Sequence, residues 1–178
     1  MTEGVLDPLT GAWSRFGLVF FAEHYLKLLR RVKREAILFV VGVDGLPADG
    51  GWEPVHEASL RETARLLRCT FRTSDVVARI EPDVFAVLLL ETSELAADAL
   101  LLRLEDRLGE WQAGHADSPP LTLSLVADRV RPDQEMAFQD ALARTVAALR
   151  TRRAAKKDRH GSSPPTRGWS ADAFLPTG

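Results

Sequence analysis

Arg72 and Asp75 are an arginine and an aspartate three positions apart, and their side chains could hold a ligand. A guanidinium can hold a phosphate or form an ion pair, and a carboxylate can accept hydrogen bonds from N–H groups. An arginine and an aspartate placed just before a hairpin can equally form a simple surface ion pair, so both interpretations stay open.

Other polar residues indicate less chemistry. The histidines have no spacing typical of metal ligands, and we expect ordinary polar roles for His24, His56, His115 and His160. The single cysteine, Cys69, excludes an internal disulfide framework and a cysteine-rich zinc site, and we expect it to be a small buried residue. Basic side chains crowd the end of the last predicted helix: Arg144, Arg150, Arg152, Arg153, Lys156, Lys157 and Arg159. We interpret them as a solvated helix end whose cations favour the helix dipole, with a partner-docking patch as the alternative.

Composition limits the class of protein that must position these residues. A chain of 178 residues allows one domain with a sizeable core and a tail. Hydrophobic residues make up 46% and charged residues 27%, which is typical of a soluble globular protein. The formal net charge of −2 argues against a broad nucleic-acid surface. No apolar run is long enough for a membrane span, and the first residues do not form a secretory signal, so we expect a cytoplasmic protein.

Hydrophobic periodicity predicts alternating helices and strands. Apolar residues recur at helical spacing in four segments, 14–34, 54–68, 93–111 and 132–157. Short apolar runs predict strands at 36–43, 76–80, 84–90 and 121–127. We expect Ser14 to cap the first helix and the first strand to be buried on both faces.

Turn chemistry connects two of these strands. Glu81-Pro82-Asp83 separates the second strand from the third, so the two predict a β-hairpin. The whole order predicts a single α+β domain with helices packed on a mixed sheet. The chain then becomes rich in Gly, Ser and Pro with only two large apolar residues, Trp169 and Phe174, and we expect a flexible tail there.

Two local motifs resemble those of a known family. The segment 7–11, DPLTG, followed by Arg15, resembles D-x-L-T-G-x-x-x-R, the opening motif of the GGDEF family of diguanylate cyclase domains. The segment 72–79, RTSDVVAR, resembles the R-x-x-D-x-x-x-R approach to the signature hairpin of that family. In the signature itself, only the third and fifth positions are kept; the five residues are Glu81, Pro82, Asp83, Val84 and Phe85. The sequence is identified as a degenerate GGDEF domain over 6–155, followed by a flexible C-terminal tail over 156–178.

The resemblance implies the family's nucleotidyl-cyclase-like fold, a central mixed sheet with a β-hairpin and flanking helices. It also implies the family's chemistry, the condensation of two GTP molecules into cyclic di-GMP (c-di-GMP) with two divalent metals. The family holds these metals with the third signature residue, here Asp83, and with an aspartate at the end of the first strand. Gly42 stands at that second position, while Asp44 keeps the next acid of the family's motif. A hard cation needs several oxygen ligands, so we expect no metal, no cofactor and no catalytic residue.

The signature turn is altered as well. Glu81 brings a negative charge to the position where the triphosphate lies in the family, and like charges repel. Pro82 lacks a backbone N–H and fixes φ, and Val84 replaces an acidic residue. These changes together predict a domain without cyclase activity.

The family has a second site, where the product c-di-GMP binds and inhibits, and its mark is R-x-x-D just before the signature. Asp75 lies six positions before Glu81, as in the family, and Arg72 supplies the arginine. An arginine of the next helix often joins this site, and counting forward without gaps places Arg103 there, with Arg107 as a substitute. The resemblance therefore implies a c-di-GMP site formed by Arg72, Asp75 and Arg103.

These features predict a catalytically inactive receptor or adaptor in bacterial second-messenger signal transduction. Its expected partners are c-di-GMP and a protein that supplies input or output, and the resemblance also allows a ligand-bridged homodimer. We expect no membrane and no nucleic acid among the partners. Two alternatives stay open: an interaction scaffold that binds no nucleotide, and a residual diguanylate cyclase or GTP-binding domain.

Overall fold

Five strands form one mixed sheet in the order β1-β3-β4-β2-β5. The computed structural model describes residues 4–47, 52–90, 92–131, 138–159 and 173–175. The strands are β1 (Trp13–Ser14), β2 (Ala36–Val43), β3 (Val76–Glu81), β4 (Val84–Leu89) and β5 (Leu123–Val130). β1 runs parallel to β3, and the other neighbouring pairs are antiparallel. The predicted hairpin is the β3–β4 pair.

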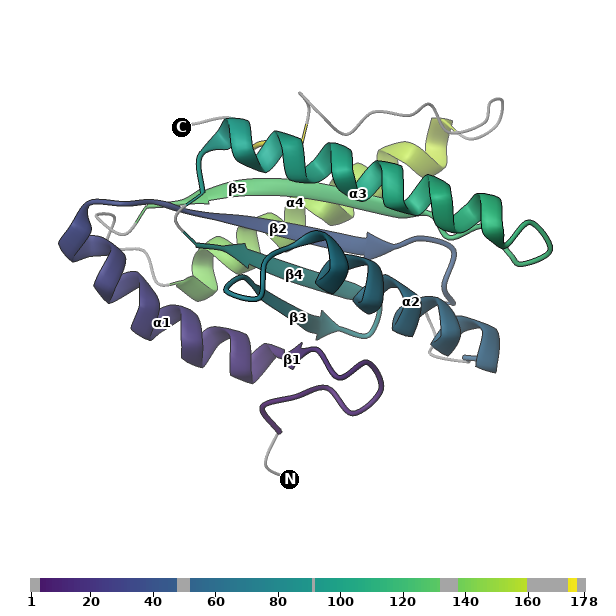
Figure 1. Cartoon of the computed structure of the whole chain (residues 1–178), viewed down its shortest axis with the longest axis horizontal. Coiled ribbons are helices and arrows are strands. Elements are labelled where there is room, and N and C mark those ends of the chain that lie inside the picture. The colour runs from purple at the N-terminus through teal and green to yellow at the C-terminus, as the bar shows by residue number, and fades with distance from the viewer. Residues whose placement is uncertain (1–3, 48–51, 91, 132–137, 160–172, 176–178) are drawn as a thin grey trace.

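Four helices flank this sheet (Figure 1): α1 (Arg15–Val32), α2 (Pro54–Thr70), α3 (Glu94–Gly114) and α4 (Phe138–Arg159). α2 and α3 pack on one face, and α1 and α4 pack on the other. The predicted α+β class, with helices on both sides of a mixed sheet, is confirmed. None of the described helices is long and apolar enough to cross a membrane.

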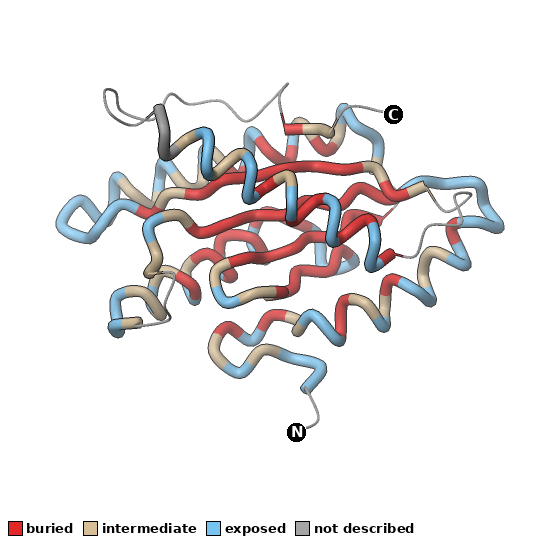
Figure 2. Tube along the Cα trace, turned by 180° about the vertical axis from the view of Figure 1, so that it is seen from behind, coloured by how far each residue is buried: buried red, intermediate tan, exposed pale blue. Residues whose placement is uncertain are grey.

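The central strand β2 supplies both halves of the core. All eight of its residues are buried, as the continuous apolar run predicts (Figure 2). Because side chains alternate along a strand, Phe39 and Val41 pack with α2 and α3, whereas Leu38 and Val40 pack with α1 and α4. This double burial fixes the end of β2, and therefore Asp44, relative to every helix.

Element ends differ from the predictions for identifiable reasons. Ser14 caps α1 as predicted, since its Oγ accepts a hydrogen bond from the Gly17 N–H at 3.1 Å. β1 was not predicted, because two residues are too short to show a pattern. β5 extends beyond residue 127 because its buried polar residue, Asp128, accepts hydrogen bonds from Arg144 and Thr145. Residues 132–137 of the last predicted helix lie outside the described residues.

Most of the segment that we expect to be a flexible tail, 160–172 and 176–178, lies outside the described residues, whereas residues 173–175 are described. Residues 173–175 lie alongside β5, where Ala127 donates its N–H to the Ala173 carbonyl at 2.7 Å and accepts from the Leu175 N–H at 2.8 Å. Phe174 packs against the core, with its ring centroid 6.4 Å from that of Phe39. An apolar side chain that reaches the core holds this short segment in place.

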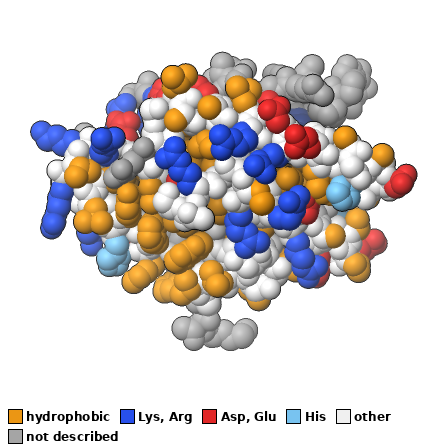
Figure 3. Space-filling view, viewed as in Figure 1, with side chains coloured by type: hydrophobic (Ala, Val, Ile, Leu, Met, Phe, Trp, Pro, Cys, Tyr) orange, Lys and Arg blue, Asp and Glu red, His pale blue; other side chains and the backbone are white. Residues whose placement is uncertain are grey.

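The face seen in Figure 1 is also distinctive in charge. Lys and Arg side chains gather over α2 and alongside α3 (Figure 3).

Cys69, which we expected to be buried, is exposed near the end of α2. The reason is helical rotation, because Leu66, Leu67 and Thr70 take the positions that face the core.

Candidate functional site

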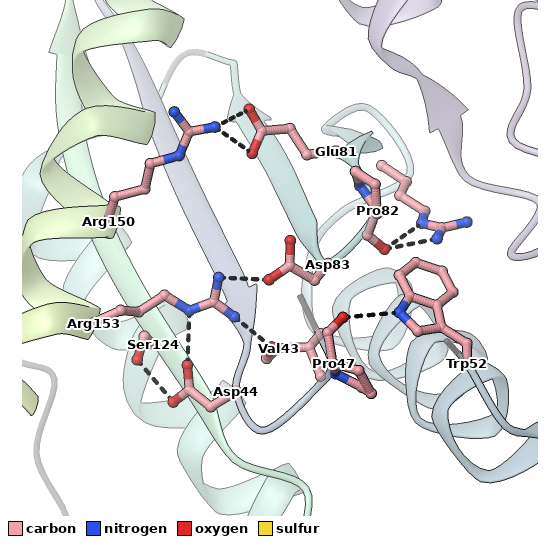
Figure 4. Close-up of polar contacts among 11 residues, drawn as sticks. Val43, Asp44, Pro47, Trp52, Glu81, Pro82, Asp83, Ser124, Arg150 and Arg153 are labelled. Carbon is pink, nitrogen blue, oxygen red and sulfur yellow. Dashed lines mark hydrogen bonds and ion pairs between the residues drawn. The ribbon is translucent and has the colours of Figure 1, made fainter. Parts of the chain in front are cut away.

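Three acidic side chains meet where β2 ends and the β3–β4 hairpin turns (Figure 4). Asp44 directly follows β2, Glu81 is the last residue of β3, and Asp83 lies in the turn between β3 and β4. The Val43 N–H donates a hydrogen bond to the Asp83 carbonyl at 2.9 Å, so the strand end and the turn lie side by side. Three carboxylates this close require compensating positive charge.

Arg153 of α4 supplies that charge from between two of the acids. Its Nε donates to Asp44 Oδ1 at 2.9 Å, and its Nη1 donates to Asp83 Oδ2 at 2.7 Å. Its Nη2 donates to the backbone carbonyl of Val43. Burial by itself lowers the pKa of this guanidinium, but the hydrogen bonds and charges of Asp44 and Asp83 outweigh burial and hold the pKa above its ordinary value.

Gly42 makes room for this guanidinium. A Cβ at position 42 would lie 2.8 Å from Cζ and 2.9 Å from Nε of Arg153, closer than real Cβ contacts. The absence of a side chain at Gly42 and the presence of Arg153 therefore belong to one arrangement. We predicted from the sequence only that a carboxylate is missing at position 42, not that an arginine lies against it.

Two further cations complete the neutralisation. Lys156 donates to Asp44 Oδ2 at 2.8 Å, and the Ser124 hydroxyl donates to the same oxygen at 2.8 Å. Arg150 donates to both carboxylate oxygens of Glu81, at 2.9 and 3.0 Å. Glu81 is therefore paired with a cation, a contact that we did not predict from the sequence. Among these described residues, three carboxylates face three cations.

The three cations were missed as site residues in the sequence. Arg150, Arg153 and Lys156 were interpreted with their neighbours as a solvated helix end. Their spacing of three residues was the available signal, because side chains three apart share a helix face. That face of α4 points to the hairpin, and the sequence alone does not reveal this orientation.

Arg79 holds the other side of the hairpin turn. Its Nε and Nη2 donate to the Pro82 carbonyl at 3.1 and 2.7 Å, and its Nη1 pairs with Asp7 at 3.1 Å. Its guanidinium also lies over the Trp52 ring, 5.3 Å from the centroid. Trp52 in turn donates its Nε1–H to the Pro47 carbonyl at 3.3 Å. These contacts tie the turn to the segments that precede α1 and α2.

The opening motif builds a loop. Asp7 Oδ2 accepts hydrogen bonds from the Thr10 N–H at 2.9 Å and from the Thr10 hydroxyl at 2.6 Å. Gly11 has a φ of 67°, a left-handed conformation that glycine adopts without strain. Arg68 of α2 donates to the Thr10 carbonyl at 3.1 Å. The motif therefore places Asp7 where it can pair with Arg79.

The last two signature residues are structural. Val84 and Phe85 lie in β4, and both are buried, with Phe85 among the largest fully buried side chains. Only Glu81, Pro82 and Asp83 remain at the turn.

The predicted ligand residues lie beside α2 and α3. Asp75 is buried, and its carboxylate accepts hydrogen bonds from the backbone N–H groups of Arg72 at 3.0 Å and Leu90 at 3.3 Å. Arg72 and Arg103 are exposed, while the substitute Arg107 is half-buried. Within the described residues neither Arg72 nor Arg103 forms an ion pair. Asp75 therefore fixes the turn after α2, and Arg72 projects from that turn.

A preformed metal cluster does not occur in the described part of the chain, since no group of three or more His, Cys, Asp or Glu side chains could hold an ion there. The three described histidines contact backbone groups, and His160 lies outside the described residues. The His56 ring accepts a hydrogen bond from the Glu53 N–H at 3.0 Å in the cap of α2. His24 and His115 contact backbone carbonyls within their own helices, at 2.8 Å each.

Comparison with known proteins identifies relatives over most of the chain. Residues 5–159 match the family model described as "Diguanylate cyclase, GGDEF domain". The chain is 25% identical over 128 residues to the probable diguanylate cyclase DgcC of Escherichia coli (strain K12). That match covers 71% of this chain but 34% of DgcC, so the chain spans about a third of this curated relative.

Solved structures share the fold. The GGDEF domain of FimX from Pseudomonas aeruginosa superposes with a TM-score of 0.71 at 23% identity, covering 87% of this chain and 96% of that one. The GGDEF domain of DgcB from Caulobacter crescentus, solved in complex with c-di-GMP, also gives 0.71, at 14% identity, covering 88% of this chain and 91% of that one. At these identities the likeness shows a common fold.

Proposed function

The chain belongs to the diguanylate cyclase GGDEF domain family, and from this premise we propose that it is a member without cyclase activity that binds c-di-GMP. The bound dinucleotide would lie against Arg72 and Arg103, on a turn fixed by Asp75. The observation that most strongly supports a loss of catalysis is the position of Arg153 between Asp44 and Asp83.

A divalent cation does not fit this arrangement. The oxygens of Asp44, Asp83 and Val43 are held by a guanidinium, which has the same sign of charge as a metal ion. A cation that entered would first have to displace Arg153, and it would then find no carboxylate at Gly42. Phosphoryl transfer from GTP depends on such ions, so we propose that the described hairpin site performs none.

A triphosphate is disfavoured at the same place. The cations Arg150, Arg153 and Lys156 are engaged by Glu81, Asp83 and Asp44. Positive charge that is already paired attracts an incoming anion only weakly.

The face of α2 and α3 supports binding instead. Arg72 and Arg103 are exposed and form no ion pair within the described residues. Lys and Arg side chains gather over α2 and alongside α3 on the face that Figure 3 shows. Exposed guanidinium groups can contact guanine or phosphate. The GGDEF domain of DgcB carries c-di-GMP in its solved structure, and the fold here is the same.

A scaffold that binds no nucleotide is the second candidate. It is favoured by the Asp75 carboxylate, whose oxygens both accept from backbone N–H groups. A carboxylate used in this way leaves fewer acceptor positions for guanine.

Calorimetric titration of the purified chain with c-di-GMP tests the proposal. We expect binding that weakens by about tenfold or more in Arg72→Ala and in Arg103→Ala, since a paired contact with guanine contributes about 1–3 kcal/mol. Arg30→Ala is the matched control, because Arg30 is an exposed arginine on α1, across the sheet. Absence of binding, or unchanged affinity in Arg72→Ala, would reject the receptor and favour the scaffold.

Incubation with GTP and either Mg²⁺ or Mn²⁺ tests the loss of catalysis. We expect no c-di-GMP in chromatograms of the reaction, with an active diguanylate cyclase as positive control. Formation of c-di-GMP by the wild-type chain would overturn the assignment of Arg153, and GTP binding without turnover would reassign the hairpin as a nucleotide-binding site.

A further inference from the structure

Exposed hydrophobic side chains in the described residues concentrate on two helices. On α1, four of them are about half exposed or more: Phe16, Phe20, Leu28 and Val32. On α3, Leu95 is 82% exposed and Leu102 is more than half exposed. Contiguous exposed apolar surface on a soluble domain marks an interaction site.

The α1 surface has an apolar row and a basic end. The four apolar residues are spaced in multiples of four, so they form one ridge inclined to the helix axis by about 26°. Lys27 and Arg31 stand beside the later part of this ridge, and they form no ion pair within the described residues. A ridge that winds around the helix fits the groove of another helix better than it fits a flat membrane surface.

The α3 surface has an apolar start and an acidic end. Leu95, Ala99 and Leu102 are exposed on one side of the helix, and Asp106 and Glu110 continue the same side. Neither of these two acids forms an ion pair within the described residues. Figure 3 shows hydrophobic and basic side chains over α1 toward the lower left of the molecule, and a group of acidic side chains, next to basic ones, over α3 in the upper part of the same face.

The two surfaces have the same spacing and opposite charge. Phe16 precedes Lys27 by as many residues as Leu95 precedes Asp106, a helical distance of about 16 Å in both cases. The same offset also pairs Arg31 with Glu110. Parallel placement of α1 against α3 therefore brings Phe16 and Phe20 beside Leu95 and Ala99, in the same register as both charge pairs.

We propose that this chain associates head to tail, with the α1 surface of one copy on the α3 surface of the next. The two surfaces are different, so the contact is heterologous and each added copy leaves one surface free. The association needs no nucleotide, and the test below is carried out without one, so its outcome is independent of the proposed function.

Sedimentation velocity over a wide range of protein concentration tests this proposal. We expect wild-type oligomers that grow with concentration, and at least a tenfold rise in the dissociation constant for Phe20→Asp and for Leu95→Asp. Both residues are exposed, so circular dichroism should show unchanged folding. Val55→Asp is the matched control, because Val55 is an exposed apolar residue on α2 and should leave association unchanged.

An equimolar mixture of the two variants gives the sharpest result. Phe20→Asp retains only the α3 surface and Leu95→Asp retains only the α1 surface, so the mixture should form dimers and nothing larger. A wild type that stays monomeric, a single variant that still dimerises, or a mixture that stays monomeric would each overturn the proposal. Binding of wild-type protein, but not Phe20→Asp, to vesicles of anionic lipid would assign α1 to a membrane and would also overturn it.

Exchange of charges tests the register. Lys27→Glu with Arg31→Glu in one chain, and Asp106→Lys with Glu110→Lys in another, should each weaken self-association at least tenfold. Mixing the two chains should restore it, since each restored contact again pairs opposite charges. Failure of the mixture to associate would contradict the proposed pairing.

Discussion

Replacement of Gly42 by alanine tests whether Arg153 occupies the space beside the end of β2. The added Cβ would lie 2.8 Å from Cζ of Arg153 and 2.9 Å from Nε, so the guanidinium would have to move. It can move, because it is the far end of a flexible side chain. In moving it would weaken its hydrogen bonds to Asp44 and Asp83, which are 2.9 and 2.7 Å long.

The expected magnitude follows from two opposing contributions. A hydrogen bond to a charged group contributes about 1.5–3 kcal/mol to the free energy of unfolding. Replacing glycine by alanine within a strand raises the same free energy by about 0.5–1 kcal/mol. Loss of one such bond gives a net decrease of about 1–2 kcal/mol in the free energy of unfolding. In an Arg153→Ala background the obstruction is gone, so Gly42→Ala should instead stabilise the chain by about 0.5 kcal/mol. The coupling between the two positions is therefore about 2 kcal/mol.

Urea unfolding of the four chains of this cycle, followed by tryptophan fluorescence, measures the coupling. Gly109→Ala is the control, because a Cβ there meets nothing within 4 Å and its effect should be equal in both backgrounds. The hydrogen bonds and charges of Asp44 and Asp83 hold the pKa of Arg153 above its ordinary value, so its contribution to stability is fully present through the neutral and mildly alkaline range and is lost only as the pH rises through that raised pKa. The coupling should thus be the same at about pH 7 and pH 9. Equal effects of Gly42→Ala in both backgrounds would refute the position of the guanidinium.

Three further predictions concern the turn after α2, the β3–β4 hairpin turn and the C-terminal segment beside β5. Asp75→Ala should lower the free energy of unfolding by about 2 kcal/mol, because two backbone N–H groups lose their acceptor. Arg72→Ala should change this free energy by less than about 0.5 kcal/mol. Equal urea midpoints for the two variants would contradict this prediction. Arg79→Ala should cost about 2–3 kcal/mol in thermal unfolding, since Asp7 loses its counterion and the hairpin turn loses its donor, and an unchanged melting temperature would count against that role. Phe174→Ser should cost about 1–2 kcal/mol in urea unfolding and speed amide exchange in β5, while wild-type exchange rates would show that the terminal segment contributes nothing.

The fold could be predicted from the sequence because its strongest signals are local. The continuous apolar run at 36–43 has the bounds of β2, and proline between two β-branched runs marks the hairpin. Buried polar residues limited the accuracy of other bounds. β5 continues through Asp128 only because Arg144 and Thr145 of α4 meet its carboxylate, and that pairing belongs to tertiary structure.

The hairpin site was predictable only in part for the same reason. Gly42, Asp44 and Asp83 could be aligned to a motif, so the missing carboxylate was visible in the sequence. The partner Arg153 lies 109 residues after Asp44, and its role depends on the rotation of α4 against the sheet. Residue types do not reveal such a rotation when basic residues occupy several faces of one helix. A count of acids near the turn would have indicated that cations must come from elsewhere.

The difference between Arg153 and Arg72 supports the proposed location of anion binding. Whereas a metal ion at this place would be exchangeable, the guanidinium of Arg153 is covalently attached to α4 and pairs with Asp44 and Asp83. Its charge is used within the protein, and an incoming phosphate would have to compete with two carboxylates. Arg72 is held by its backbone through Asp75, so its guanidinium remains exposed on a fixed turn. An anionic ligand binds best to positive charge that is preorganised and unpaired. We therefore expect an anionic ligand to bind at the face of α2 and α3 rather than at the hairpin.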